Sequence, residues 1–396
     1  MKTSGLNILI ATPHFPFPMI GGERIKLFNL IKHLAKKHNV FLVSFDRGYE
    51  VRQEYIDVIK SLGVDTTVFK INHIAAALSA GLFTLFRNPL EIEYFEHSKF
   101  RNQINEIMNN HKIDLVLSFF IRTAEHVKKL PVKKILVAED CRSYYQKRTS
   151  ESSKKLRQKF IRGYDAVKIA RYESDIMNYF DRTTVVTEED RKQMLKLNPA
   201  ADIRIISQGV DTDIYTPSID AKDRNDILFL GKLDVWANIL MVNKIVLEIF
   251  PLIKKANPGV RLHIAGANPV KGILNFQSES IQIHQNPVDI TPFYQKAAVF
   301  LHPHSGGSGV QNKVLEAMAS GCPVVTSQSG ANGINISNGE NGYIAGCNEE
   351  FAHYTIEMLT NKNQREKVGI NARQYVETEK SWESVFKAWD NMIDEL

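Results

Sequence analysis

Short apolar runs alternate with stretches of helical periodicity along almost the whole chain, and this alternation constrains the fold more than any other feature. Up to residue 210 the apolar runs are NILIAT (7–12), VFLVSF (40–45), TTVFKI (66–71), DLVLSFF (114–120), KILVAE (134–139), RTTVVT (182–187) and IRIIS (203–207). The pattern then restarts with DILFLG (226–231), RLHIAG (261–266), IQIHQ (281–285), AVFLHP (298–303), PVVTS (323–327) and GYIAG (342–346). Strands and helices that alternate at this spacing predict parallel sheets wrapped by helices, so two rounds predict two doubly wound α/β domains.

The length of the chain agrees with two domains, because 396 residues exceed what one ordinary core accommodates. The polar stretch PSIDAKDRND (217–226) separates the two rounds. We therefore expect a first domain over 1–215 and a second over 216–378, with 379–396 as a C-terminal helix that packs back toward the first domain. Ligands of open parallel sheets collect outside the carboxyl ends of the strands, so we expect the two domains to face each other across a cleft.

The sequence gives no indication of a membrane span or a secreted protein. The apolar run at 74–86 is shorter than the roughly 20 residues that cross a bilayer, and the first residues lack the apolar region of a signal peptide. The three cysteines have no CxxC spacing, which indicates reduced thiols rather than a disulfide frame or a zinc site. We expect a cytoplasmic protein with no nucleic-acid partner.

Charge is distributed unevenly along the chain. Residues 1–210 contain 34 Lys and Arg against 23 Asp and Glu, whereas residues 211–396 contain 16 against 21. The densest basic stretch is 154–171, in which a helix could place six apolar residues on one side with basic residues around them: Leu156, Phe160, Ile161, Tyr164, Val167 and Ile169. Such a helix can lie on an anionic membrane, at the inner face of the plasma membrane, or bind an anionic acceptor. The alternative is the solvated face of an ordinary surface helix.

The stretch HPHSGGSGVQNKVLEAMASGCPVV (302–325) joins a glycine-rich loop to a short helix expected to begin near Gly309 or Val310. Glycines allow backbone N–H groups to approach a ligand closely, and a helix N-terminus favours an anion such as a phosphate. Lys313 is placed to neutralise a diphosphate, and Glu316 to accept hydrogen bonds from the vicinal diol of a ribose. The alternative is a surface Lys–Glu pair at i, i+3.

Several motifs occur together in an order that resembles a known family. The chain contains LVAEDCRS, ISQGVDTDIYTP, ILFLGKLDVWANI, NPVDITPFYQKAAVFLHPH and the stretch just described. In this combination they resemble family 4-type retaining glycosyltransferases of the GT-B fold, in particular the branch associated with bacterial exopolysaccharide clusters. The resemblance covers nearly the whole chain.

The resemblance implies a transferase that moves a sugar from a UDP- or GDP-sugar to a glycan or lipid-linked acceptor, with no metal and no other cofactor. The donor would lie on the second domain, with Glu316 on the ribose and Lys313 and Lys232 on the diphosphate. First-domain backbone at Gly21 and Gly22 would approach the distal phosphate. The remaining donor-binding residues would be those of the glycine loop, Gly307, Ser308, Gly309 and Val310.

The chain departs from the family pattern at two points. The family carries a glutamate eight positions before Glu316, where this chain has Ser308, which brings no charge to the anomeric carbon. Many relatives also place a histidine on the acceptor side. Here Asp140 is the candidate for the acceptor-side catalytic group, with His14 as a second, although Asp140 is equally typical of a helix cap and His14 of a structural histidine. Together with Lys313, these two are the predicted catalytic residues.

Two other functions remain open on the sequence. A non-catalytic protein that binds nucleotide sugars is motivated by Ser308. A nicotinamide-dependent oxidoreductase is suggested by Gly21, Gly22 and Asp46, but the chain lacks the G-x-G-x-x-G turn of a dinucleotide site.

Overall fold

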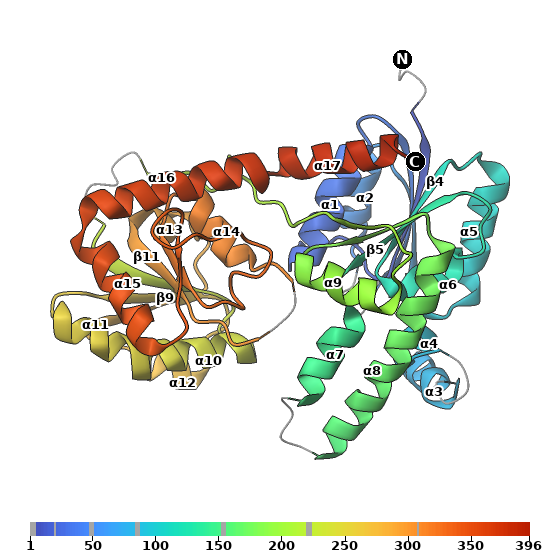
Figure 1. Cartoon of the computed structure of the whole chain (residues 1–396). Helices are drawn as coiled ribbons and strands as arrows, with labels where there is room; N and C mark the ends of the chain where they lie inside the picture. Colours follow the sequence, from blue (N-terminus) through green and yellow to red (C-terminus); the bar gives the residue numbers. More distant parts are fainter. Residues whose placement is uncertain are drawn as a thin grey trace. The chain divides into compact units, whose positions relative to one another are not determined.

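The computed structural model describes residues 5–19, 21–46, 51–83, 88–151, 156–218, 224–306 and 309–396. Contacts divide the chain into two compact units: unit 1, Met1–Ser207 with Ala388–Leu396, and unit 2, Gln208–Lys387. Each unit contains one sheet with parallel strand pairing, covered by helices (Figure 1). The predicted fold class, two doubly wound α/β domains, is therefore confirmed, and each predicted strand forms with ends within two residues of the prediction.

Unit 1 has a seven-stranded sheet in the order β3-β2-β1-β4-β5-β6-β7. The strands are β1 Asn7–Thr12, β2 Asn39–Asp46, β3 Asp65–Lys70, β4 Leu115–Phe119, β5 Lys133–Glu139, β6 Arg182–Val185 and β7 Ile203–Ile205. The helices are α1 Gly22–Leu34, α2 Gln53–Ser61, α3 His73–Phe83, α4 Leu90–Phe95, α5 Ser98–Asn110, η1 Ile121–Thr123, α6 Ala124–Val127, α7 Arg142–Glu151, α8 Leu156–Ile176, η2 Met177–Tyr179 and α9 Glu188–Leu197. The central strands read as unbroken apolar runs because helices bury both faces of a parallel sheet.

Unit 2 has a six-stranded sheet in the order β10-β9-β8-β11-β12-β13. The strands are β8 Asp226–Leu230, β9 Leu262–Gly266, β10 Ile281–Gln285, β11 Ala297–His302, β12 Val324–Thr326 and β13 Tyr343–Ile344. The helices are α10 Trp236–Lys244, η4 Ile245–Ile249, α11 Phe250–Ala256, α12 Lys271–Leu274, α13 Thr291–Lys296, α14 Asn312–Ala319, α15 Asn348–Thr360, α16 Lys362–Glu379 and α17 Trp382–Asp394. Two apolar clusters lie on this unit, one containing Phe229 and Leu301 and one containing Leu230 and Phe300.

One run of helix in the described residues, 236–256, is long and apolar enough to span a membrane by composition alone. Its side chains Met241, Val242, Ile245 and Ile253 are nevertheless buried in the core of unit 2. One side of the run therefore packs in the core of unit 2, and four charged residues, Lys244, Glu248, Lys254 and Lys255, interrupt its apolar pattern in the sequence.

The division between the units falls after Ser207, earlier than the expected boundary at 215. Val210 pairs with Ser381, and a Cβ added to Gly209 would lie 2.4 Å from the Trp382 ring, so this segment packs within unit 2. The last residues of α17 belong instead to unit 1. There Trp389 is fully buried, and Asp390 accepts hydrogen bonds from His33 of α1 and from Lys37, which follows this helix, at 2.7 and 2.6 Å.

Candidate functional site

The loop between β11 and α14 is shaped by glycines. Gly306 and Gly309 have φ of 86° and 77°, in the left-handed region that favours glycine. Helical geometry begins at Asn312, because Gln311 is still extended, with φ −86° and ψ 97°. The prediction that the helix starts near Gly309 or Val310 is therefore wrong, and both residues lie in the loop. The predicted donor residues Gly307 and Ser308 lie outside the described residues.

Lys313 and Glu316 meet on α14. Lys313 Nζ lies 2.9 Å from Glu316 Oε2, and the Tyr294 hydroxyl donates to the same oxygen at 3.0 Å. The Glu316 side chain is 11% exposed, whereas that of Lys313 is 34% exposed. Burial and the neighbouring Glu316 carboxylate both raise the pKa of Tyr294 and of Tyr215, so both phenols stay protonated. The nearly buried Glu316 carboxylate thus lies between a partly exposed cation and a hydrogen-bond donor, on the helix that follows the carboxyl end of β11.

Lys232 follows the carboxyl end of β8, the strand next to β11 in the sheet. Its side chain is half exposed, with Nζ 3.5 Å from Asp234. The turn before it is tightly packed, because a Cβ on Gly266 would lie 1.7 Å from the Gly231 carbonyl oxygen. Lys232 and the β11–α14 loop therefore lie at the same edge of one sheet, where a ligand of a parallel sheet is expected.

Unit 1 places its two predicted catalytic residues at the carboxyl ends of β1 and β5, which flank β4 in the sheet. His14 is buried, with its ring 5.2 Å from that of Phe120 and Nε2 3.7 Å from Glu23 Oε1. Asp140 is half-buried and follows Glu139, whose φ of 71° is unusual for a residue with a side chain. Left-handed non-glycine residues at strand ends, here Phe120 and Glu139, are frequent at functional sites.

Two buried carboxylates flank Asp140. Glu139 accepts a hydrogen bond from Lys26 Nζ at 2.7 Å, and burial raises its pKa although the Lys26 charge acts in the opposite direction. Glu173 accepts the backbone N–H groups of Arg142 and Ser143 at 2.7 and 3.1 Å, which caps the start of α7. Burial raises the pKa of Glu173 to about 7.

The glycine pair predicted to meet a phosphate lies at the start of α1, after the carboxyl end of β1. Gly21 is the N-cap of the helix, with φ of 95°, and a Cβ added to it would have no atom within 4 Å. Gly22 is the first helical residue. Space for the close approach of a ligand to this backbone is therefore present in unit 1.

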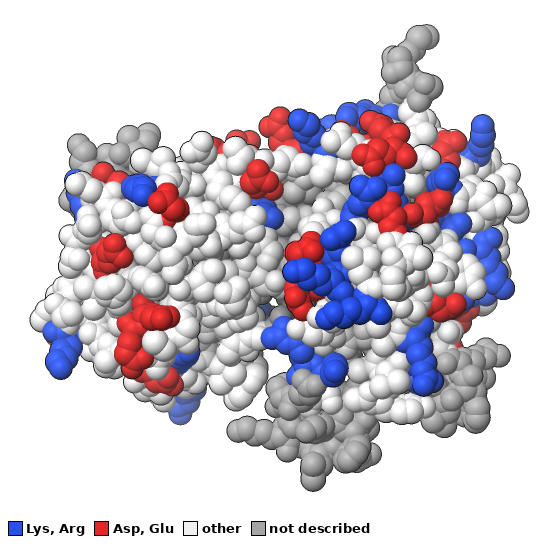
Figure 2. All heavy atoms as spheres, in the orientation of Figure 1, with Lys and Arg blue, Asp and Glu red and all other residues white. Residues whose placement is uncertain are grey.

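The basic stretch 154–171 lies on α8, apart from Lys154 and Lys155, which are outside the described residues. The prediction that its apolar residues share one side is wrong. Ile169 is fully buried, while Tyr164 and Val167 are 59% and 54% exposed. A pocket of about 810 Å³ lies beside it, lined by residues of α7, α8 and α9 that include Lys147, Arg148, Lys196, Ala166, Val167 and Ala170. Figure 2 shows Lys and Arg side chains gathered over α9 on this face.

Part of unit 2 matches a known protein family. Residues 224–361 match the family described as glycosyl transferases group 1. The chain carries a group 1 glycosyltransferase domain. A curated relative, described as an uncharacterized 44.6 kDa protein in the cps region of Klebsiella pneumoniae, is 23% identical over 96% of this chain and 99% of its own length.

The group 1 domain and unit 1 together have the GT-B fold. A crystal structure of Anabaena Alr3699/HepE in complex with UDP and glucose superposes with a TM-score of 0.66 at 12% identity, over 98% of this chain and 99% of that one. Sucrose-phosphate synthase from Thermosynechococcus elongatus gives 0.70 at 15% identity, over 98% of both chains. The predicted resemblance to GT-B glycosyltransferases is confirmed, and the nicotinamide alternative finds no support in the family match.

Two tyrosines beside Glu316, and an arginine that bonds the backbone of one of them, were not singled out from the sequence. Tyr294 lies inside the group 1 domain, whereas Tyr215 and Arg373 lie outside the matched residues. Arg373 donates to the backbone carbonyls of Tyr215, Thr212 and Ala319, which ties the segment that follows QGVD to the end of α14. Tyr215 and Tyr294 stand in the quoted motifs, but only the fold shows that both rings approach Glu316.

Proposed function

We propose that this glycosyltransferase moves a sugar from a UDP- or GDP-sugar to an acceptor hydroxyl with retention of anomeric configuration, in the synthesis of a surface polysaccharide or glycoconjugate. The observation that carries the proposal is the Glu316 carboxylate, nearly buried and held by Lys313 and Tyr294 at the carboxyl end of β11. The cps-region relative supports the polysaccharide role, and the UDP and glucose bound by the Anabaena protein support the donor class.

The chemistry of the donor follows from the contacts of α14. A ribose diol offers two O–H donors, and the carboxylate of Glu316 can accept both while Tyr294 keeps its bond. Lys313 is one-third exposed, so its ammonium can exchange Glu316 for a diphosphate oxygen. Lys232 would supply a second cation from the neighbouring strand, and the loop backbone at Gly309 and Val310 would approach the phosphates. These charges would stabilise the leaving diphosphate as the glycosidic bond breaks.

On the acceptor side, Asp140 would orient the attacking hydroxyl, with His14 as a neighbour at the same edge of the sheet. Attack on the face that the diphosphate leaves retains the configuration, and a departing diphosphate oxygen takes the hydroxyl proton. Cys141, next to Asp140, lines the pocket of unit 1 that contains Lys147, Arg148 and Lys196. Three cations over an apolar floor suit an anionic acceptor with an apolar part, such as a lipid-linked glycan at a membrane surface.

Replacement of Glu316 tests the donor site. Glu316→Ala should weaken binding of a nucleoside diphosphate by about 10- to 150-fold, on the order of 1.5–3 kcal/mol, because charge-assisted hydrogen bonds to the ribose are lost. Glu316→Gln keeps an acceptor for Tyr294 and separates the lost charge from a packing defect. Titration calorimetry with UDP and GDP gives the affinities, and Glu340→Ala, an exposed carboxylate paired with Lys367, is the control.

Unchanged affinity in Glu316→Ala with a folded protein would contradict the proposed donor site. The non-catalytic alternative is tested with the same protein, because release of free sugar from a bound nucleotide sugar in the absence of acceptor requires turnover.

A further inference from the structure

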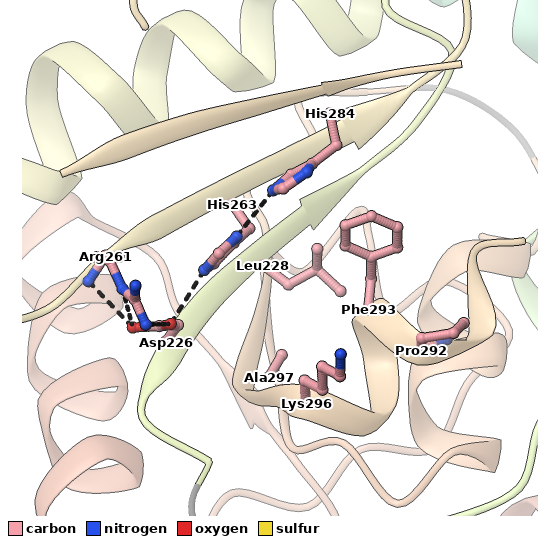
Figure 3. Close-up of a pocket in the computed structure, with 9 residues that line it drawn as sticks. All are labelled: Asp226, Leu228, Arg261, His263, His284, Pro292, Phe293, Lys296 and Ala297. Atoms are coloured by element: carbon pink, nitrogen blue, oxygen red, sulfur yellow. Dashed lines mark hydrogen bonds and ion pairs between the residues drawn. The ribbon is translucent and has the colours of Figure 1, made fainter. Parts of the chain in front are cut away.

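Unit 2 contains a pocket that does not include the residues proposed to bind the donor. It has a volume of about 380 Å³ and is lined by Asp226, Leu228, Arg261, His263, His284, Pro292, Phe293, Lys296 and Ala297 (Figure 3). Asp226, Arg261 and Ala297 stand at the amino ends of β8, β9 and β11, whereas Lys313 and Glu316 follow the carboxyl end of β11. Those three residues therefore stand at the opposite end of the sheet from Lys313 and Glu316, while His284 lies near the carboxyl end of β10 and bonds His263 of β9.

One wall of the pocket is a continuous chain of polar side chains. Arg261 Nη2 lies 2.9 Å from Asp226 Oδ2, and His263 Nε2 lies 3.0 Å from the same oxygen. His263 Nδ1 lies 2.9 Å from His284 Nε2, so each imidazole is held in place by its neighbour. The two rings are nearly parallel, with centroids 5.2 Å apart and an interplanar angle of 17°. This wall is pre-organised before any ligand binds.

Another side of the pocket comes from α13, which contributes Pro292, Phe293 and Lys296, and of these Phe293 lies beside His284 (Figure 3). The Phe293 ring stands edge-on to His284, with centroids 4.9 Å apart and an interplanar angle of 62°. Leu228 and Ala297 add apolar surface between the walls. His284 and Phe293 are therefore already in contact, and a planar ring would lie against the aromatic surface that they form with Leu228, in the stacked or edge-on contacts that aromatic groups prefer.

The charge of the pocket favours an anion. The carboxylate of Asp226 is already engaged by Arg261 and His263, and the pKa of Asp226 lies below its usual value because their hydrogen bonds outweigh its burial. Lys296 forms no ion pair within 4.0 Å with any residue that the structure describes. The Lys296 ammonium is therefore a charge of the pocket that no carboxylate neutralises within 4.0 Å among the described residues. The pocket is mostly apolar, so its attraction to an anion is stronger than in water.

We propose that this pocket binds a small aromatic carboxylate, with the ring against the contacting pair His284 and Phe293 and the carboxylate on Lys296. The volume is within the range of pockets that hold small organic ligands. The proposal does not depend on the proposed function, since no residue of the pocket is assigned to the donor or the acceptor.

Three probes that share one ring system and differ in charge test this site: 2-naphthoate, 2-naphthalenemethanol and 2-naphthylmethylammonium. We expect the full chain to bind naphthoate about tenfold or more tightly than the neutral alcohol and not to bind the amine measurably. Lys296→Met should remove the preference for naphthoate while leaving binding of the alcohol unchanged. Lys255→Met, which removes an exposed lysine of α11, should have no effect.

Imidazole NMR signals locate the bound probe. Naphthoate should shift the resonances of His263 and His284, assigned with His284→Gln, and UDP should not displace it. Equal binding of the three probes, retained naphthoate preference in Lys296→Met, or unshifted histidine signals would overturn the proposal. Stoichiometric displacement by UDP would also overturn it, because the pocket would then belong to the nucleotide site.

Discussion

Both units place a Lys–Glu pair beside the carboxyl end of a strand, but the two pairs differ in how completely they are enclosed. In unit 1, Lys26 is 1% exposed and binds both Glu139, at 2.7 Å, and the Ile206 carbonyl, at 3.0 Å. In unit 2, Lys313 is 34% exposed and has Glu316 as its ion-pair partner at 2.9 Å. The distance between the lysine nitrogen and the carboxylate oxygen is similar in the two pairs. The pairs differ in the burial of the lysine and in the number of its partners.

The comparison separates a structural pair from one available to a ligand. Lys26 joins α1, the end of β5 and residue 206, and no part of its ammonium can turn to a ligand without leaving Glu139 buried and unpaired. Lys313 can turn away, because Tyr294 still donates to Glu316. A charged residue near a strand end is thus a better candidate for binding when its partner keeps another hydrogen bond.

Removal of the enclosed lysine should have the largest effect. Lys26→Met should lower the free energy of unfolding of unit 1 by about 3–5 kcal/mol, because Glu139 would remain buried without a cation. The measurement is urea unfolding followed by circular dichroism. The double variant Lys26→Met, Glu139→Gln should recover part of the loss, since the uncompensated charge is gone. A loss below about 1 kcal/mol, the range of surface pairs, would contradict the assignment of Lys26 as structural.

The buried Glu173 of unit 1 predicts that the stability of this unit depends on pH. Its pKa in the folded chain, about 7, lies above its ordinary value of 4.5, so between these values the folded chain holds a proton that the unfolded chain has lost. The contribution to stability is therefore complete below about pH 4.5 and decreases as the pH rises to about 7, by up to about 1.4 kcal/mol per pH unit.

The test compares Glu173→Gln with wild type in urea at several pH values. The stability difference between them should change across this interval and level off above about pH 7. The control is Glu54→Gln, which removes a carboxylate that is 62% exposed. Its free energy of unfolding should change with pH as that of wild type does. Parallel curves for wild type and Glu173→Gln would show that the carboxyl is already ionised throughout.

The smallest effect on stability is expected at Lys313. Lys313→Met should change the free energy of unfolding by no more than about 0.5 kcal/mol, as for other i, i+3 pairs on a helix. Its affinity for UDP should nevertheless fall more than its affinity for uridine, because the proposed partner is the diphosphate. Lys367→Met, which breaks the exposed pair with Glu340, serves as the control. An equal loss of affinity for UDP and for uridine would show that Lys313 does not act on the phosphates.

The fold was predictable because strand and helix patterns are local. Each apolar run became a strand, and the parallel order followed from the helices between them. The start of α14 was missed because it depends on the left-handed φ of Gly309 and the extended Gln311, which residue type alone does not fix. The exposed face of α8 was also missed, because neighbouring helices decide which of its apolar residues are buried.

For the candidate site, sequence motifs indicated which residues carry chemistry but not what surrounds them. Lys313 and Glu316 stand three apart on a helix, so their pairing is a local property. Tyr294 is distant in sequence, and its hydrogen bond to Glu316 results from the packing of α13 on the sheet. The paired Lys26 and Glu139 are 113 residues apart, a separation that no periodicity reveals.

The C-terminal helix α17 gives each unit its own optical reporter. Trp389 is fully buried in unit 1, whereas Trp382, two turns earlier on the same helix, packs against Gly209 in unit 2. The third tryptophan of the chain, Trp236, is 71% exposed. Indole emission shifts to longer wavelength when the ring becomes exposed to water, so chains that retain only Trp382 or only Trp389 would record the melting of one unit at a time.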